Sequence, residues 1–223
     1  MPAMPVAGMA PAMASEGLDP MTATATYRAT LSTAWSAANF ATQFPAGRHF
    51  SGLVGATHDA SVSLWREGGP ASPGMKNMAE LGEKAALLVE IGAAQLAGSV
   101  DIALSGGGIG SAETRVALEF KLTRRHPLLT LVAMVAPSPD WFVGVSGQEL
   151  LKDSRWMTRL EIALEVYDAG TDSGLSFASP DLPSSPREPI QPLTSLPADT
   201  DLSAGLHRAT RAPLAVLTLE RLN

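Results

Sequence analysis

The sequence contains no cysteine among its 223 residues. This absence excludes disulfide bonds, thiolate metal sites, a cysteine nucleophile and a bacterial lipid anchor, which is attached through cysteine. It leaves the compartment open, because a cysteine-free chain fits a secreted bacterial protein as well as a cytosolic one.

Long apolar runs and basic stripes are also missing. No uninterrupted apolar run reaches the roughly 18 residues that a membrane-spanning helix needs. The chain has 16 Lys and Arg against 22 Asp and Glu, which gives a net charge of −6. The basic residues are scattered, so nucleic-acid binding is not expected. Hydrophobic residues make up 45% of the chain, which is enough for a large core.

Residues 1–24 form a tail rich in Pro, Met and Ala that has no hydrophobic period, and we predict the folded domain over 25–223. The tail carries no Lys or Arg before Arg28, and its prolines oppose a helix, so it differs from an intact secretory signal. We therefore interpret this stretch as a tail, with the remainder of a longer, removed leader as the alternative.

The tail has two further interpretations. Thioethers are soft ligands that suit Cu(I), and the tail offers four of them, Met1, Met4, Met9 and Met13. The same apolar residues would also suit a strand that adds to the sheet edge of a second copy, which predicts a self-associating assembly subunit.

The rest of the chain has a mainly β pattern. Alternating or short continuous apolar segments, bounded by Gly and Pro, predict strands over 24–35, 60–65, 99–105, 115–123, 128–136, 141–147, 159–168 and 212–222. Residues 74–97 break this pattern with apolar residues at helical spacing. We predict helices near 76–81 and 84–97, separated by Gly82 and ended by Gly98. Residues 179–206 contain six prolines and are expected to form a surface loop.

This arrangement indicates the fold class. Strands joined by turn-rich loops, with helices confined to one insertion at about 75–97, favour an antiparallel β-sandwich over βαβ units.

Two segments gather acidic residues at predicted strand ends. Asp140 follows Pro-Ser-Pro, and Asp168 and Asp172 lie in the glycine-containing segment YDAGTDSG. Carboxylates that converge in such loops repel one another, and a hard cation relieves that repulsion. Ca²⁺ accepts irregular oxygen shells more readily than Mg²⁺ does. The alternative is that Asp and Gly are ordinary turn residues.

The same segments carry a family resemblance. FPAGRHFSGLVGATHDASVSLWREGGPASPG, KNMAELGE, HPLLTLVAMVAPSPDWFVGVSG and YDAGTDSGLSFASP closely resemble the spondin N-terminal domain family, from about Tyr27 to Leu222. The resemblance implies a Greek-key β-sandwich similar to calcium- and phospholipid-binding domains. It also implies a divalent cation, Ca²⁺, held in loops at one end of the sandwich. Matching the family's ligands residue by residue gives Asp140, Asp168 and Asp172, with Glu119 as a fourth from the Leu-Glu pair of the preceding strand.

The resemblance implies a binding or adhesion module, secreted, periplasmic or on the cell surface. The partner is an unknown extracellular protein, glycan or surface ligand. The Cys-free, Ala-rich composition suggests a bacterial member that lacks the cysteines and further modules of animal spondins, so animal partners are not transferred.

Other residues have simpler interpretations. In a sandwich the four tryptophans are expected in the core rather than as sugar-stacking platforms, and Trp141 is expected beneath the metal loop. His58 is expected to be a hydrogen-bonded strand-end residue, with a place near a loop site as the alternative. No nucleophile, base and orienting group can be named together, so the chain is not predicted to be an enzyme.

Overall fold

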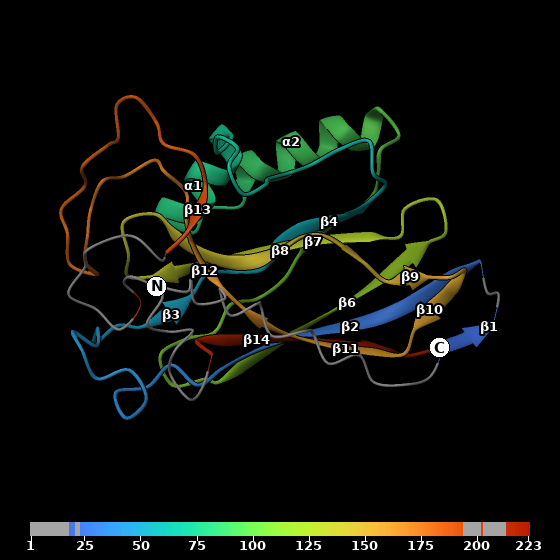
Figure 1. The fold of residues 1–223 in the computed structure, drawn as a ribbon, viewed down its shortest axis with the longest axis horizontal. Coiled ribbons are helices and arrows are strands. Elements are labelled where there is room, and N and C mark those ends of the chain that lie inside the picture. Colours follow the sequence, from blue (N-terminus) through green and yellow to red (C-terminus); the bar gives the residue numbers. More distant parts are fainter. Residues whose placement is uncertain (1–17, 21–22, 194–201, 203–212) are drawn as a thin grey trace, which may run out of the picture.

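A computed structural model describes residues 18–20, 23–193, 202 and 213–223. Figure 1 shows three layers: a pair of helices, a larger sheet beneath them and a smaller sheet below that. Both sheets are antiparallel throughout their recorded pairings. The prediction of an all-β sandwich with a short helical insertion is therefore confirmed.

The smaller sheet has the spatial order β11 (Arg159–Leu164), β14 (Ala215–Arg221), β2 (Thr24–Thr33) and β6 (Arg115–Thr123). The larger sheet has the order β13 (Gln191–Pro192), β12 (Val166–Asp168), β8 (Trp141–Glu149), β7 (Leu128–Ala136), β4 (Val54–His58) and β5 (Val100–Ser105). Strand β3 (His49–Phe50) pairs with the end of β7. A third, small sheet has the order β1 (Leu18–Pro20), β10 (Arg155–Met157) and β9 (Leu151–Lys152).

The core has two parts because the larger sheet is covered on both faces. In β7 the odd-numbered residues from Leu129 to Val135 pack toward the smaller sheet, whereas Val132 and Met134 pack in the cluster that contains the helices. A strand covered on both faces has a continuous apolar sequence rather than an alternating one. This double burial explains the almost wholly apolar composition of β7.

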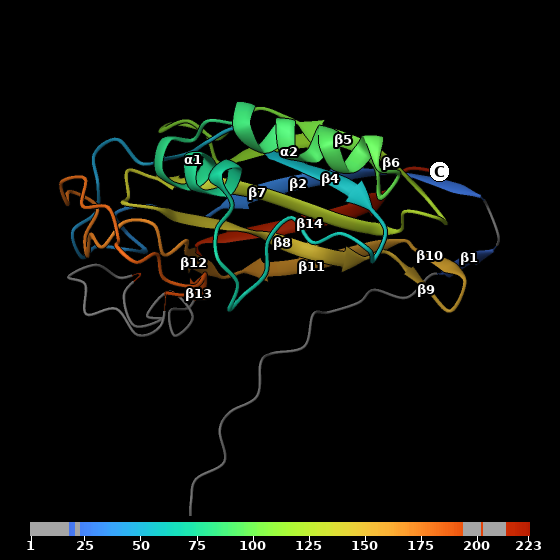
Figure 2. The ribbon, with the colours of Figure 1, turned by 90° about the horizontal axis from the view of Figure 1, so that it is seen from above.

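The helical insertion closes the outer face of the larger sheet (Figure 2). Helix α1 (Pro73–Leu81) begins after Ser72, whose hydroxyl accepts a hydrogen bond from the Met75 amide at 3.1 Å. It ends at Gly82, which has a φ of 69° that favours glycine. Helix α2 (Ala85–Leu96) follows, so both predicted helices are confirmed. Neither helix in the described residues is long and apolar enough to cross a membrane.

The predicted strand over 60–65 is wrong. The strand here is β4, Val54–His58, and all five of its residues are buried. Residues 59–69 instead form a loop that carries Trp65 onto the outer face of the sheet, against Phe142 and Tyr167 at ring distances of 5.1 and 5.0 Å. The apolar residues of this loop imitate strand alternation because they cap the helix-facing core.

Two other predicted boundaries differ from the structure. The segment 159–168 is divided at Glu165 into β11 and β12, which belong to different sheets. Both flanking residues, Leu164 and Val166, remain in the core between the sheets. The segment 1–24 also contains β1, which pairs with β10. Met1, Met4, Met9 and Met13 lie outside the described residues, so the copper and self-association hypotheses stay predictions.

Candidate metal site at the end of the sandwich

Strand pairing brings the two acidic segments together. Asp140 directly precedes β8, and Asp168 is the last residue of β12. These strands pair so that Asp168 lies opposite Trp141, one residue from Asp140. The amide of Ala169 also donates to the carbonyl oxygen of Asp140 at 3.3 Å. Two motifs that lie far apart in the sequence therefore meet at one end of the larger sheet.

Asp140 is completely buried, with 0% exposure. Its Oδ2 accepts hydrogen bonds from the amides of Thr171 and Asp172 at 2.7 and 3.0 Å. The Thr171 hydroxyl donates to the same oxygen at 3.2 Å. The other oxygen, Oδ1, is sealed from solvent and has no hydrogen-bond partner in the described part of the chain. A buried charged oxygen without a partner is costly, so this atom requires an explanation.

The other two aspartates are also buried, at 4% exposure for Asp168 and 5% for Asp172. Asp168 accepts from the Gly170 amide at 2.7 Å through Oδ1. Asp172 uses both oxygens, which accept from the amides of Gly174 and Leu182 at 2.7 and 2.8 Å. Each side chain thus organises the backbone of the long loop that follows β12.

Gly170 is required for this loop to close. It has a φ of 71°, a conformation that side chains rarely adopt. A Cβ atom at this position would lie 2.2 Å from the carbonyl oxygen of Glu188, which belongs to the returning arm of the loop. The Glu188 amide donates to the Gly170 carbonyl at 2.8 Å. The close approach of the two arms brings Glu188 near the aspartates, and no sequence spacing indicated this.

The carboxylates destabilise one another's charged forms. Burial, with repulsion from Asp172, raises the pKa of Asp140 to about 6, although the hydrogen bonds from Thr171 and Asp172 oppose the shift. Burial, together with the charges of Asp140, Glu188 and Asp172, raises the pKa of Asp168 to about 7. At neutral pH the site therefore holds negative charge at a cost that a nearby cation would relieve.

A calcium ion fits these donors only with help from the backbone. Among the described residues, no group of three or more His, Cys, Asp or Glu side chains forms a metal cluster. Ca²⁺ commonly completes its shell with backbone carbonyls and waters, so a full set of side chains is not required. The donor that fits best is the sealed Oδ1 of Asp140, a hard oxygen to which no residue in the described ranges donates a hydrogen bond.

Glu119 does not join this cluster. It lies on β6 opposite Arg28 of β2, and its Oε1 accepts from Arg28 Nη2 at 2.7 Å. Its side chain is 55% exposed, and no hydrogen bond recorded for the described residues connects it to the three aspartates. We therefore leave Glu119 out of the candidate site.

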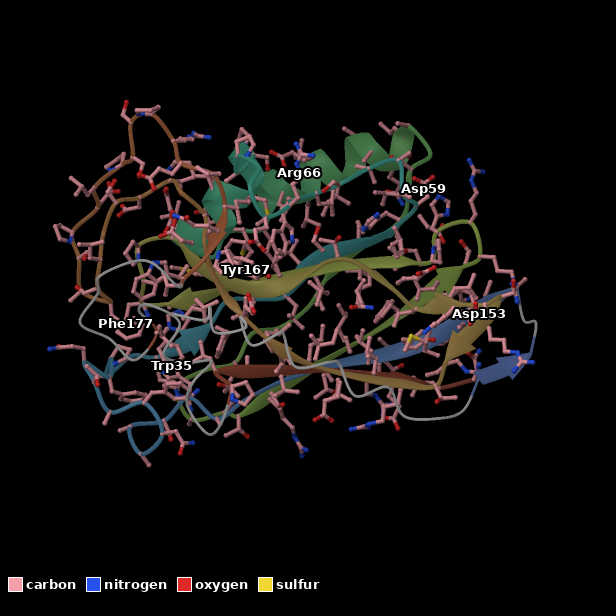
Figure 3. All side chains as sticks on the ribbon, in the orientation of Figure 1. Trp35, Asp59, Arg66, Asp153, Tyr167 and Phe177 are labelled. Atoms are coloured by element: carbon pink, nitrogen blue, oxygen red, sulfur yellow. The ribbon has the colours of Figure 1, made fainter. Side chains whose placement is uncertain are left out.

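A cluster of aromatic side chains packs beside the acidic loop. Phe177, from the loop after Asp172, packs against Trp35 and Trp141 at ring distances of 5.5 and 5.4 Å. Figure 3 shows Trp35 and Phe177 together at one end of the sandwich. Trp141 is fully buried, and all four tryptophans are at most 6% exposed. The expectation that the tryptophans lie in the core is confirmed, whereas no sequence pattern indicated a role for Phe177.

His58 lies at the opposite end of the same sheet, next to Asp59 (Figure 3). Its Nδ1 donates to the Asp59 carbonyl at 2.8 Å, and its Nε2 contacts the Thr130 hydroxyl at 2.8 Å. Thr130 Oγ1 also accepts from the Gly147 amide at 2.9 Å. His58 is thus a hydrogen-bonded strand-end residue, as predicted, and lies away from the candidate metal site.

Comparisons with known proteins agree with this architecture. The Spondin_N family model matches residues 25–212. Human Spondin-2 is 36% identical over 206 residues, which cover 90% of this chain and 62% of that protein. Chicken (Gallus gallus) Spondin-1 is 38% identical over 181 residues, which cover 78% of this chain and 22% of that protein. The chain thus spans less than two thirds of the length of these relatives.

The family match covers nearly all of the described sandwich, including both acidic segments. Spondins are non-enzymatic extracellular proteins, which agrees with a secreted or extracellular location. The bacterial origin suggested by composition stays a prediction. The chain belongs to the spondin N-terminal domain family.

Proposed function

We propose that this chain is an extracellular binding module whose end loops are held in shape by Ca²⁺. The observation that carries the proposal is the sealed Oδ1 of Asp140, which has no hydrogen-bond partner in the part of the chain that the structure describes. Two further buried carboxylates, Asp168 and Asp172, raise the local negative charge. The cation would supply the positive charge that no described side chain provides there.

The three aspartates would have different roles. Asp140 Oδ1 and the Asp168 oxygen that accepts no recorded hydrogen bond would face the ion, because their other oxygens already serve the backbone. Asp172 would hold the loop arms through its bonds to Gly174 and Leu182. Fixing this loop would also fix Phe177 against the core. The surface formed by these loops would then meet a protein, glycan or other surface ligand without an ordering cost.

Thermal unfolding with Ca²⁺ and with a chelator tests the site. Calcium at about a hundred times its dissociation constant is expected to add about 2.7 kcal/mol to the free energy of unfolding. Asp140→Asn removes the negative charge that would face the ion and is expected to abolish the shift. Asp172→Ala is expected to abolish it too, because the loop arms lose their anchor.

Glu161→Gln provides a matched control, because Glu161 is an exposed carboxylate that pairs with Arg159 on β11. This variant should keep the full calcium shift. If the wild-type protein shows no shift, and elemental analysis of the purified protein finds no calcium, the proposed site is rejected.

A further inference from the structure

Arg48 is a buried cation near the end of the sandwich that carries the acidic loops. It directly precedes β3, and only 9% of the residue is exposed. In the pairing of β3 with β7, His49 lies opposite Ala136. Arg48 therefore lies one step beyond that pair, next to the turn that leads to Asp140.

Two backbone carbonyls are the only hydrogen-bond acceptors that the described residues give the Arg48 guanidinium. Its Nη1 donates to the backbone carbonyls of Gly110 and Glu113 at 3.4 and 3.2 Å. The carboxylate of Glu113, the residue whose backbone carbonyl accepts from Arg48, is already engaged, because its Oε2 accepts from the Gly110 amide at 2.6 Å. No ion pair is recorded for Arg48 among the described residues.

Buried arginines are almost always paired, because removing a charge from water is costly without a counter-charge. In Arg48 the pair of nitrogens Nε and Nη2 has no recorded acceptor in the described part of the chain. In the same part of the chain, three side-chain polar atoms are sealed from solvent and have no hydrogen-bond partner: Trp65 Nε1, Asp140 Oδ1 and Trp141 Nε1. Neither Nε nor Nη2 of Arg48 is one of them. The free edge of the guanidinium is therefore reached by solvent, whereas the rest of the side chain is covered.

The neighbouring backbone leaves room for a ligand. Gly47 is exposed, and a Cβ atom placed on it would meet no atom within 4 Å. The free edge offers two parallel N–H donors, a geometry that matches the two oxygens of a carboxylate. The backbone carbonyls that bind Nη1 hold the other side of the fork in a fixed orientation.

We propose that Arg48 is a carboxylate-binding subsite that receives an Asp or Glu side chain from an acidic segment of a protein partner. The inference rests on the proposed binding role and deepens it, because it names the chemistry of the partner. It does not require the calcium site, since the donors belong to Arg48 alone. Arg48 would thereby acquire the counter-charge that the described residues do not provide.

Fluorescence anisotropy with a fluorescein-labelled hexaglutamate peptide tests the subsite, with hexaglutamine as the uncharged reference. The wild-type protein is expected to bind hexaglutamate and not hexaglutamine, in chelator as well as in Ca²⁺. Arg48→Gln should weaken binding about tenfold or more, because a charge-assisted bidentate contact is lost. Arg48→Lys keeps the charge but loses the fork, so it should also weaken binding.

Arg66→Gln is the matched control, because it makes the same charge change at an exposed arginine in another loop. Equal weakening by Arg66→Gln and Arg48→Gln would show only general charge attraction and would overturn the assignment. Competition by sodium sulfate as strong as by sodium acetate at equal ionic strength would also overturn it, because the subsite would then bind any anion.

Two further measurements complete the test of the Arg48 subsite. If Arg48→Gln fails to fold, the Nε–H resonance of Arg48, assigned by its loss in Arg48→Lys, should shift when hexaglutamate is added to the wild-type protein. An unmoved resonance would reject the subsite. The calcium shift in thermal unfolding should persist in Arg48→Lys, so failure of the subsite and failure of the calcium proposal are distinguishable.

Discussion

The two ends of the larger sheet both bury polar side chains, but they satisfy them differently. At the end near Asp59, Thr130 Oγ1 connects His58 to the Gly147 amide, and the His58 ring completes the set with the Asp59 carbonyl. At the end near Phe177, three carboxylates are buried together, the pKa values of Asp140 and Asp168 are raised, and Asp140 Oδ1 has no partner in the described residues.

The difference separates a structural network from a binding site. Donors and acceptors that match one another form a closed set that stabilises the fold without any ligand. Like charges that are buried together store a cost that only a further group can remove. The end with Asp140 is therefore expected to respond to cations, and the end with Thr130 is not.

The largest expected effect is a pH dependence of the metal-free protein. The pKa values of Asp140 and Asp168 are raised from 3.8 to about 6 and about 7. The folded state binds these two protons more tightly than the unfolded state does. The stabilisation that the bound protons give is therefore complete below the ordinary pKa of the carboxyl groups, and it is lost as pH rises through their folded-state pKa values. One pKa unit corresponds to about 1.4 kcal/mol, so the two shifts together correspond to a loss on the order of 6 kcal/mol in chelator between pH 4 and pH 8.

Urea unfolding of the wild-type protein and of Asp168→Asn across this pH range isolates the contribution of Asp168 to the pH dependence of stability. The variant should lose less stability as pH rises, and saturating Ca²⁺ should flatten the wild-type curve. Identical pH profiles for the two proteins in chelator would contradict the coupled acidic cluster.

Thr130→Val is expected to destabilise the protein by about 2 kcal/mol, because the buried His58 ring and the half-buried Gly147 amide lose their shared contact. Chemical denaturation measures the change. Thr130→Ser retains the hydroxyl and should recover most of the loss. The calcium shift should remain intact in both variants, and its disappearance would show that the two ends are not independent.

The smallest expected effect is that of Glu119→Gln. The pair that Glu119 forms with Arg28 is about half exposed, so its removal should cost about 0.5 kcal/mol or less. Thermal unfolding should show an unchanged calcium shift. A lost shift would return Glu119 to the metal site and would contradict its separation from the aspartates.

The sequence predicted most of the elements, and its failures have a common cause. Strand β6 and helix α1 were found because alternation and caps are local signals that survive in the fold. Strand β4 was missed because burial on both faces removes alternation, and the loop after it carries apolar residues that face the helix-side core. The break at Glu165 was missed because Leu164 and Val166 remain apolar on either side of the crossing between sheets.

For the candidate site, too, the sequence indicated some of the residues and missed others. The motifs PSPDWF and DAGTDSG indicated Asp140, Asp168 and Asp172, and the structure brings these three together. The fourth expected residue, Glu119, is paired with Arg28 instead. Thr171, Phe177 and Glu188 were not identified, since their roles depend on how the loop after β12 folds back on itself.

The sequence by itself determined the family, the sandwich class, the helical insertion and the three aspartates, because each is encoded by local pattern or by long matching motifs. Only the tertiary structure decided that one oxygen of Asp140 is sealed and that Arg48 is buried, with neither a partner for that oxygen nor a counter-charge for Arg48 among the described residues. Burial and hydrogen-bond satisfaction depend on which distant segments meet, and the pairing of β12 with β8 and of β3 with β7 sets those meetings.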